Sequence, residues 1–186
     1  NDLAWLSDRG VIHLSLSTWP LSQEEINRAV KKAKPSYSSE QVVLSGDIDA
    51  LKEGVERLKG IGYKKAVFLN VSGPFHSPLM KDAADKLKIE LSKISKKDIL
   101  MPIVCNVDAI PEQNKENIED KLYRQMFSPV LWERCVKRMA TEGVEIFLEV
   151  GPQKVLSNLI KRITPDIPCY NIEEIEDVEA FKKALS

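Results

Sequence analysis

His76 is the residue of this sequence whose type and position best suit proton transfer. It lies in the segment GPFHSP (73–78), where Ser77 and Pro78 are favourable residues for the N-cap and first turn of a helix. Loops between a strand and a helix often hold catalytic side chains, and the positive end of a helix favours a neutral imidazole. We therefore expect His76 to accept a proton from a reacting hydroxyl. A histidine that only packs against or caps the loop is the alternative.

Two polar residues further along the chain have positions from which they could assist His76. Asn106 follows an expected strand over 101–105, and open α/β sheets bind ligands at the carboxyl ends of their strands. Gln125 ends an expected helix over 117–126, where main-chain carbonyls lack partners within the helix and could accept a bond from an imidazole N–H. Taken singly, a local turn at Asn106 and a surface helix end at Gln125 are the stronger interpretations.

Other kinds of site receive little support from the sequence. Cys105, next to Asn106, could act as a thiol nucleophile with His76, but buried cysteines at strand ends are usually inert. The three cysteines and two histidines lack the close spacing of zinc ligands, so we predict no metal site. The sequence contains no Gly-x-Ser-x-Gly elbow and no dinucleotide-binding fingerprint.

Composition limits the class of protein. The 186 residues include 27 basic and 28 acidic side chains, a net charge of −1, which argues against a nucleic-acid partner. No apolar run approaches the ~20 residues of a membrane span, so we expect no membrane association. An odd number of cysteines without a signal-like start favours reduced thiols and a cytoplasmic location.

The first part of the chain has the pattern of a small α+β unit. Strands are expected at 11–17, 41–44 and 65–71, with helices at 22–33 and from Asp47 or Asp49 to Gly60. Leu51, Val55 and Leu58 mark the apolar face of the second helix. This order predicts a roughly ferredoxin-like unit over 11–72, with one strand missing or hidden in 34–40.

The second part alternates helices with strands, which predicts an α/β layer with a mostly parallel sheet. Its expected helices are 78–95, 117–126, 131–142, 154–163 and 177–186, and its expected strands are 101–105, 144–150 and 167–171.

Four segments of the sequence resemble, in order and separation, the malonyl-CoA:acyl-carrier-protein transacylase family. The segment VSGPFHSPLM (71–80) resembles the active-site histidine segment of that family, and CNVD (105–108) its asparagine segment. The segment YRQMFSPVLW (123–132) resembles its glutamine segment, and the stretch 149–156 its Glu-Val-Gly-Pro motif. Several motifs in the right order make this resemblance far more specific than any single one.

The resemblance implies a transfer reaction and roles for four residues. In the family a serine attacks the thioester of malonyl-CoA, and the malonyl group then passes to the phosphopantetheine thiol of acyl carrier protein, in fatty-acid or polyketide biosynthesis. Carried over, His76 is the general base and the main-chain carbonyl of Gln125 holds it. Phe75 and Asn106 are implied substrate-binding residues, with Phe75 typical of malonyl-selective members. The resemblance implies no bound cofactor, because the coenzyme A thioester is the substrate.

The implied fold is α/β, a partial α/β-hydrolase-like parallel-sheet core over 73–186 joined to the ferredoxin-like small subdomain over 11–72. The family's Gly-Gln-Gly oxyanion segment, nucleophile elbow and malonyl-binding arginine have no counterpart in this sequence. We therefore expect the chain to be the C-terminal part of such an enzyme, with the missing N-terminal segment as a partner. The isolated chain should be inactive and should expose apolar sheet edges. A non-catalytic module that binds carrier protein or coenzyme A is the alternative.

Overall fold

The computed structural model describes residues 9–15, 34–38, 41–60, 66–69 and 73–185. The chain divides into two compact units, Asn1–Trp132 and Glu133–Ser186, and each is described by itself. The predicted helix over 22–33 lies outside the described residues.

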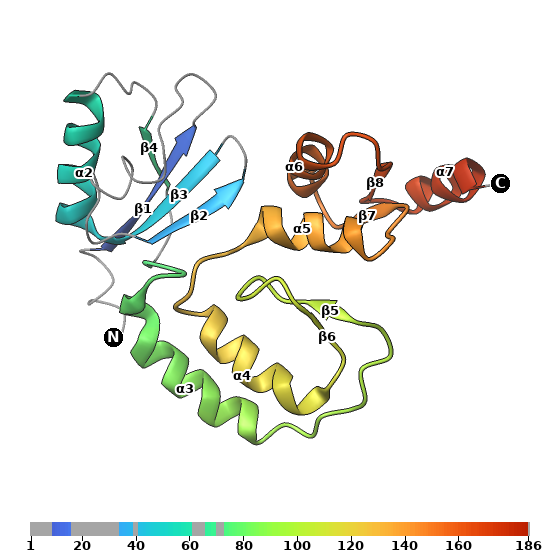
Figure 1. The fold of residues 1–186 in the computed structure, drawn as a ribbon, viewed down its shortest axis with the longest axis horizontal. Coiled ribbons are helices and arrows are strands. Elements are labelled where there is room, and N and C mark those ends of the chain that lie inside the picture. Colours follow the sequence, from blue (N-terminus) through green and yellow to red (C-terminus); the bar gives the residue numbers. More distant parts are fainter. Residues whose placement is uncertain (1–8, 16–33, 39–40, 61–65, 70–72, 186) are drawn as a thin grey trace. The chain divides into compact units, whose positions relative to one another are not determined.

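The first unit contains a four-stranded sheet formed by β1 (Arg9–Ser15), β2 (Lys34–Ser38), β3 (Gln41–Asp47) and β4 (Ala66–Leu69). The strand order is β2-β3-β1-β4, and all neighbouring strands are antiparallel (Figure 1). The strand β2 is the one predicted to be hidden in 34–40. β1 and β3 pair along their full lengths, from Arg9 opposite Asp47 to Ser15 opposite Gln41.

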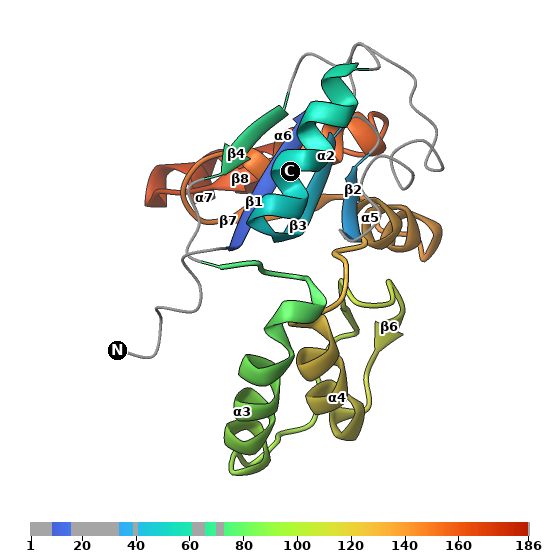
Figure 2. The same cartoon turned by 90° about the vertical axis from the view of Figure 1, so that its left-hand side faces the viewer.

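Helix α2 (Ile48–Gly60) covers one face of this sheet (Figure 2). It begins after Asp47, whose carboxylate accepts hydrogen bonds from the backbone N–H groups of Asp49 and Ala50, both at 3.1 Å. Leu51 and Leu58 are fully buried, and Val55 nearly so. The predicted apolar face of this helix is therefore confirmed, and its burial is the main hydrophobic contribution to the packing of α2 on the sheet.

Two neighbouring helices follow the sheet in the chain. A single 3₁₀ turn, η2 (Pro78–Met80), leads into α3 (Lys81–Ser92), and α3 lies beside α4 (Lys115–Gln125) (Figure 2). The prediction of one continuous helix over 78–95 is therefore wrong at both ends. Proline at the first position of the turn is compatible with the tight 3₁₀ geometry. Ile94, inside the predicted range, lies beyond the end of α3 and is exposed.

The predicted strand over 101–105 does not join a parallel sheet in the described part of the chain. It shortens to β5 (Ile103–Val104), which pairs antiparallel with β6 (Pro111–Glu112). The chain turns back at once, because the N–H of Ala109 donates to the carbonyl of Cys105 at 2.9 Å and Ala109 has a φ of 58°. A connection this short permits a hairpin but is too short for the crossover that parallel strands need.

The second unit contains the parallel strands predicted by the sequence. β7 (Phe147–Val150) and β8 (Cys169–Ile172) pair in parallel, and α6 (Val155–Ile163) connects them and packs against both. Helix α5 (Trp132–Thr141) leads into this unit, and α7 (Ile175–Leu185) packs against β8. Val150, the last residue of β7, is 76% exposed.

Candidate active site around His76

His76 lies in the 73–77 segment that precedes η2 and has a left-handed backbone conformation. Its φ is 61°, a region that non-glycine residues adopt infrequently, with histidine, asparagine and aspartate enriched among them. The neighbouring Pro74 and Ser77 are buried, and the Ser77 hydroxyl donates to the Pro74 carbonyl at 2.7 Å. This bond closes the segment around His76. Residues held in such conformations cluster at functional sites.

Both the backbone and the ring of His76 contact the C-terminal end of α4. The His76 N–H donates to the carbonyl of Met126 at 3.2 Å, and ring Nδ1 lies 3.0 Å from the carbonyl oxygen of Gln125. These carbonyls are available because a helix leaves its last carbonyls without partners. The N–H groups of Met126 and Phe127 donate instead to the carbonyls of Tyr123 and Arg124, respectively.

The contact with Gln125 determines which ring nitrogen can accept a proton. A main-chain carbonyl oxygen only accepts hydrogen bonds, so Nδ1 must carry the hydrogen. In the neutral imidazole the lone pair then lies on Nε2, at the opposite side of the ring. The geometry therefore suits a general base that acts through Nε2.

The predicted capping role of Ser77 is wrong in one respect. Ser77 occupies the N-cap position of η2, but its hydroxyl makes no capping bond and is directed to Pro74. The α-helical part of the segment begins only at Lys81. The carbonyl of Gln125, rather than the start of the helix, is thus the contact that orients the ring.

Phe75 and Asn106 have different surroundings. Phe75 directly precedes the histidine, and this residue is 43% exposed. Asn106 lies in the turn after β5, and its carbonyl accepts the N–H of Leu131 at 2.9 Å. That bond joins the turn to the segment that follows α4. The substrate-binding role of both residues stays a prediction.

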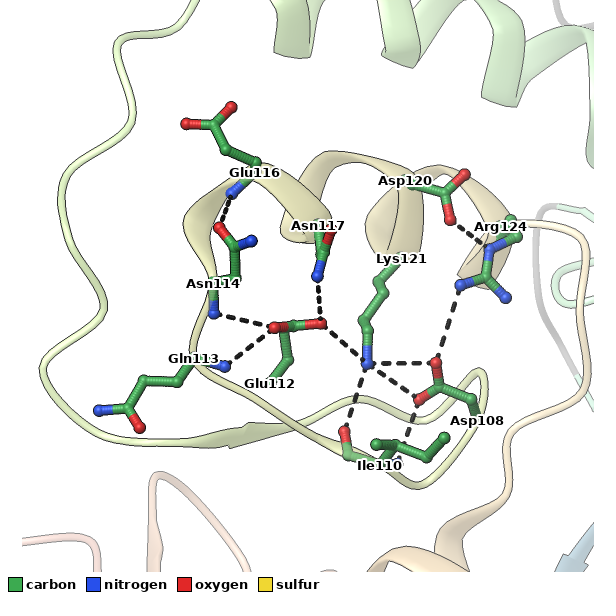
Figure 3. A network of polar contacts seen from close by, with 10 residues as sticks. All are labelled: Asp108, Ile110, Glu112, Gln113, Asn114, Glu116, Asn117, Asp120, Lys121 and Arg124. Atoms are coloured by element: carbon green, nitrogen blue, oxygen red, sulfur yellow. Dashed lines mark hydrogen bonds and ion pairs between the residues drawn. The ribbon is translucent and has the colours of Figure 1, made fainter.

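A cluster of charged side chains beneath α4 was not predicted (Figure 3). Lys121 is only 6% exposed, and its Nζ lies 3.2 Å from Asp108 Oδ2 and 3.5 Å from Glu112 Oε2. Hydrogen bonds from the N–H of Asn114 and from the Asn117 amide, together with Lys121, lower the pKa of Glu112 despite the opposing effect of burial. Nothing in the local sequence marks Lys121 as buried, because its partners lie on a separate hairpin.

A second group of side chains ties α4 to α3. The Tyr123 hydroxyl donates to Asp85 Oδ1 at 2.7 Å, and the Lys81 ammonium lies 4.4 Å from the centre of the Tyr123 ring. Phe127 packs edge-on against Tyr123 with ring centres 5.1 Å apart. The residues on both sides of Gln125 are therefore held by packing as well as by hydrogen bonds.

Cys105 has the environment of a structural rather than a reactive thiol. The side chain is buried, and this burial raises the pKa of the thiol, with smaller effects from the charges of Lys121 and Asp108. A raised pKa reduces the thiolate fraction that a nucleophilic cysteine needs. The alternative of a thiol enzyme built on Cys105 and His76 is therefore disfavoured.

The Glu149 segment of the second unit caps a helix. The carboxylate of Glu149, at the end of β7, accepts the N–H groups of Leu156 and Ser157, at 3.0 and 2.8 Å, and the Ser157 hydroxyl at 2.5 Å. Burial opposes the charge of Glu149, but these hydrogen bonds outweigh it and lower the pKa of the carboxyl. Asn171 of β8 donates to the carbonyl of Gln153 at 2.8 Å and so supports the same loop. The segment has a clear structural role.

Clusters of potential metal ligands and membrane-spanning helices are both absent from the part of the chain that the structure describes. Among these residues, no group of three or more His, Cys, Asp or Glu side chains is arranged to hold a metal ion. Within the same described ranges, no helix has the length and apolar character needed to cross a membrane.

Comparison with known proteins identifies the class of this chain. Residues 21–179 match the family model described as "Acyl transferase domain", and the chain belongs to this family. It is 40% identical over 145 residues to a malonyl CoA-acyl carrier protein transacylase of Bacillus subtilis (78% of this chain, 46% of the relative). It is 44% identical over 134 residues to the protein of that name from Escherichia coli K12 (72% and 43%).

A solved structure extends the similarity to the fold. A malonyl-CoA:acyl carrier protein transacylase of Xanthomonas oryzae superposes with a TM-score of 0.90 at 29% identity, covering 98% of this chain and 60% of that one. The α/β class and the family resemblance predicted from the sequence are thereby confirmed. The chain spans about half the length of the curated relatives it matches, at 46% and 43%.

Proposed function

We propose that this chain acts in the transfer of a malonyl group from malonyl-CoA to the phosphopantetheine thiol of acyl carrier protein, in fatty-acid or polyketide biosynthesis. The observation that carries the proposal is the 3.0 Å contact between His76 Nδ1 and the Gln125 carbonyl, which leaves Nε2 as the proton acceptor. The names of the relatives, malonyl CoA-acyl carrier protein transacylases, supply the substrate and the carrier.

The proposed mechanism uses His76 twice. Nε2 takes the hydroxyl proton of a serine while the serine oxygen bonds to the thioester carbonyl carbon, and the coenzyme A sulfur leaves with that proton. His76 then takes the proton of the carrier thiol, whose sulfur attacks the acyl-serine. The serine oxygen leaves with the proton, which restores the starting state. Phe75 and Asn106 are proposed to contact the substrate.

We propose that the nucleophilic serine comes from another segment of the enzyme, since these 186 residues contain no Gly-x-Ser-x-Gly elbow. No bound cofactor is needed in this scheme.

The finer aspects of the fold belong to the same proposal. We propose a ferredoxin-like subdomain over 11–72, supported by the observed strand order β2-β3-β1-β4. We propose that residues 73–186 belong to an α/β-hydrolase-like core, supported by the parallel pair β7 and β8. The cytoplasmic location stays a prediction.

A chimera tests the proposal. The 134 residues of this chain that align with the Escherichia coli relative replace the matching region of that protein, and malonyl transfer from radiolabelled malonyl-CoA to acyl carrier protein is measured. We expect the chimera to transfer malonyl groups and the isolated chain to transfer none. A folded chimera without transfer activity, together with binding of carrier protein by the isolated chain, would favour the non-catalytic binding module instead. Turnover by the isolated chain would contradict the proposed source of the serine.

A further inference from the structure

Lys121 is a nearly buried cation placed one helical turn before Gln125. Its Nζ lies 3.2 Å from Asp108 Oδ2, 3.5 Å from Glu112 Oε2 and 3.4 Å from the carbonyl oxygen of Ile110 (Figure 3). All three partners lie on the 108–112 segment, which contains the turn into β6 and the whole of that strand. The lysine thus joins α4 to that segment through several contacts at a single atom.

This arrangement restricts where α4 can lie. A buried ammonium group without partners is strongly unfavourable, so the helix is stable only where Nζ reaches Asp108 and Glu112. Arg124, on the next turn of α4, lies 3.7 Å from Asp108 Oδ2 and 2.6 Å from Asp120. A rotation or a slide of α4 along its axis would break the Lys121 contacts together with the Arg124 contact.

The 106–112 segment contacts the chain on both sides of the carbonyls that hold His76. Lys121 and Arg124, which precede those carbonyls in the chain, both contact Asp108. Leu131, which follows them in the chain, donates its N–H to the carbonyl of Asn106 at 2.9 Å. The carbonyls of Gln125 and Met126 lie between these two points and receive the ring and the backbone N–H of His76. The position of the imidazole therefore depends on how the 106–112 segment holds α4.

We propose that Lys121 is a positioning residue for His76, acting through the end of α4 rather than by contact with the ring. This inference rests on the proposed function of His76 as a base. The Lys121 contacts keep the Gln125 carbonyl where it binds Nδ1–H, and so keep Nε2 as the proton acceptor. Lys121 touches no reacting atom.

The test determines which tautomer the His76 ring adopts in the 186-residue chain. Nitrogen-15 spectra at mildly alkaline pH distinguish the Nδ1–H from the Nε2–H tautomer, and His13→Asn removes the signals of the other histidine. Lys121→Met keeps an unbranched side chain without the charge, and Lys121→Arg keeps the charge. Lys115→Met is the matched control, because Lys115 also lies on α4 but pairs with exposed Asp98 at 2.7 Å.

We expect the Nδ1–H tautomer in the wild-type chain and in Lys115→Met, its loss in Lys121→Met, and partial recovery in Lys121→Arg. A folded Lys121→Met chain with the wild-type ring spectrum would overturn the inference. If Lys121→Met does not fold, Asp108→Asn decides: it retains the volume of the side chain but weakens the contacts with Lys121 and Arg124. A wild-type ring spectrum in that variant would equally contradict the proposal.

Different measurements would overturn the inference and the proposed function. In the chimera, Lys121→Met should lower kcat about 10- to 100-fold with little change in KM, as expected for a displaced base. Full activity of the chimera with His76→Asn would overturn the function of His76 whatever the ring spectra show. Loss of activity with His76→Asn but unchanged kcat with Lys121→Met would overturn only the positioning role.

Discussion

The Nδ1 atom of His76 lies 3.0 Å from the main-chain oxygen of Gln125, a residue 49 positions later in the chain. The backbone N–H of His76 binds the very next carbonyl, that of Met126, at 3.2 Å. His76 thus donates one hydrogen bond to each of two adjacent carbonyls that have no partner within α4. The same two bonds complete the helix end and orient the imidazole.

Removal of the His76 imidazole should abolish most transfer activity. In the chimera with the Escherichia coli relative, His76→Asn should lower the rate of acyl-serine formation about 10²- to 10⁴-fold, the usual contribution of a general base. Single-turnover labelling with malonyl-CoA measures this step. His13→Asn, at the other histidine of the sequence, is the control and should retain activity. Equal rates for the two variants would contradict a catalytic role for His76.

The left-handed backbone at His76 should make this position sensitive to the type of side chain. At a φ of 61°, asparagine is tolerated, whereas a β-branched residue crowds the backbone. We expect His76→Val to lower the free energy of unfolding about 1 kcal/mol more than His76→Asn. Urea unfolding of the two variants measures the difference. Equal stabilities would indicate that the segment relaxes to an ordinary conformation.

The buried and exposed lysines of α4 should differ in their contribution to stability. Lys121→Met leaves Asp108 and Glu112 without their buried cation, and we expect a loss of about 3 kcal/mol. Lys115→Met removes an ion pair whose carboxylate is largely exposed, so its cost should be below about 1 kcal/mol. Thermal unfolding compares the two. A similar small cost for both would mean that Lys121 is hydrated in solution.

The helix cap formed by Glu149 should make the second unit sensitive to acid. The pKa of Glu149 is lowered in the folded chain, so its stabilisation is complete above the ordinary value of 4.5 and is lost as the pH falls through the lower, folded-state value. At neutral pH, Glu149→Gln should cost about 1 kcal/mol, and this difference should shrink in acid. Unfolding curves between neutral and acid pH test this, with exposed Glu145→Gln as a control expected to match wild type at neutral pH. A difference independent of pH would contradict the capping role of the carboxylate.

Burial should make Cys105 slow to react with alkylating reagents. Its raised pKa and its burial both reduce attack by the thiolate, whereas the side chain of Cys169 is partly exposed. We expect iodoacetamide to label Cys169 well before Cys105 in the native chain, as followed by peptide mass spectrometry. Rapid labelling of Cys105 below pH 8 would revive the thiol-enzyme hypothesis.

Local patterns predicted much of the secondary structure but not all of the pairing. The spacing of Leu51, Val55 and Leu58 identified the buried face of α2, because side chains three and four apart share one side of a helix. The strand over 101–105 was predicted to lie in a parallel sheet because helices and strands alternate along the second part of the chain. Its partner is β6, which follows a few residues later, and two short paired segments leave no periodic pattern.

By itself, the sequence determined the family, the residue types of the proposed site and the presence of a helix end at Gln125. Only the tertiary structure decided that His76 meets that end through both its ring and its backbone, that its φ is 61°, and that Lys121 is buried among carboxylates. The physical reason is the range of the interactions. Helix faces and caps depend on residues within about one turn of one another, so the sequence displays them directly. Contacts across 49 residues depend on how separate elements pack, and no local pattern encodes them.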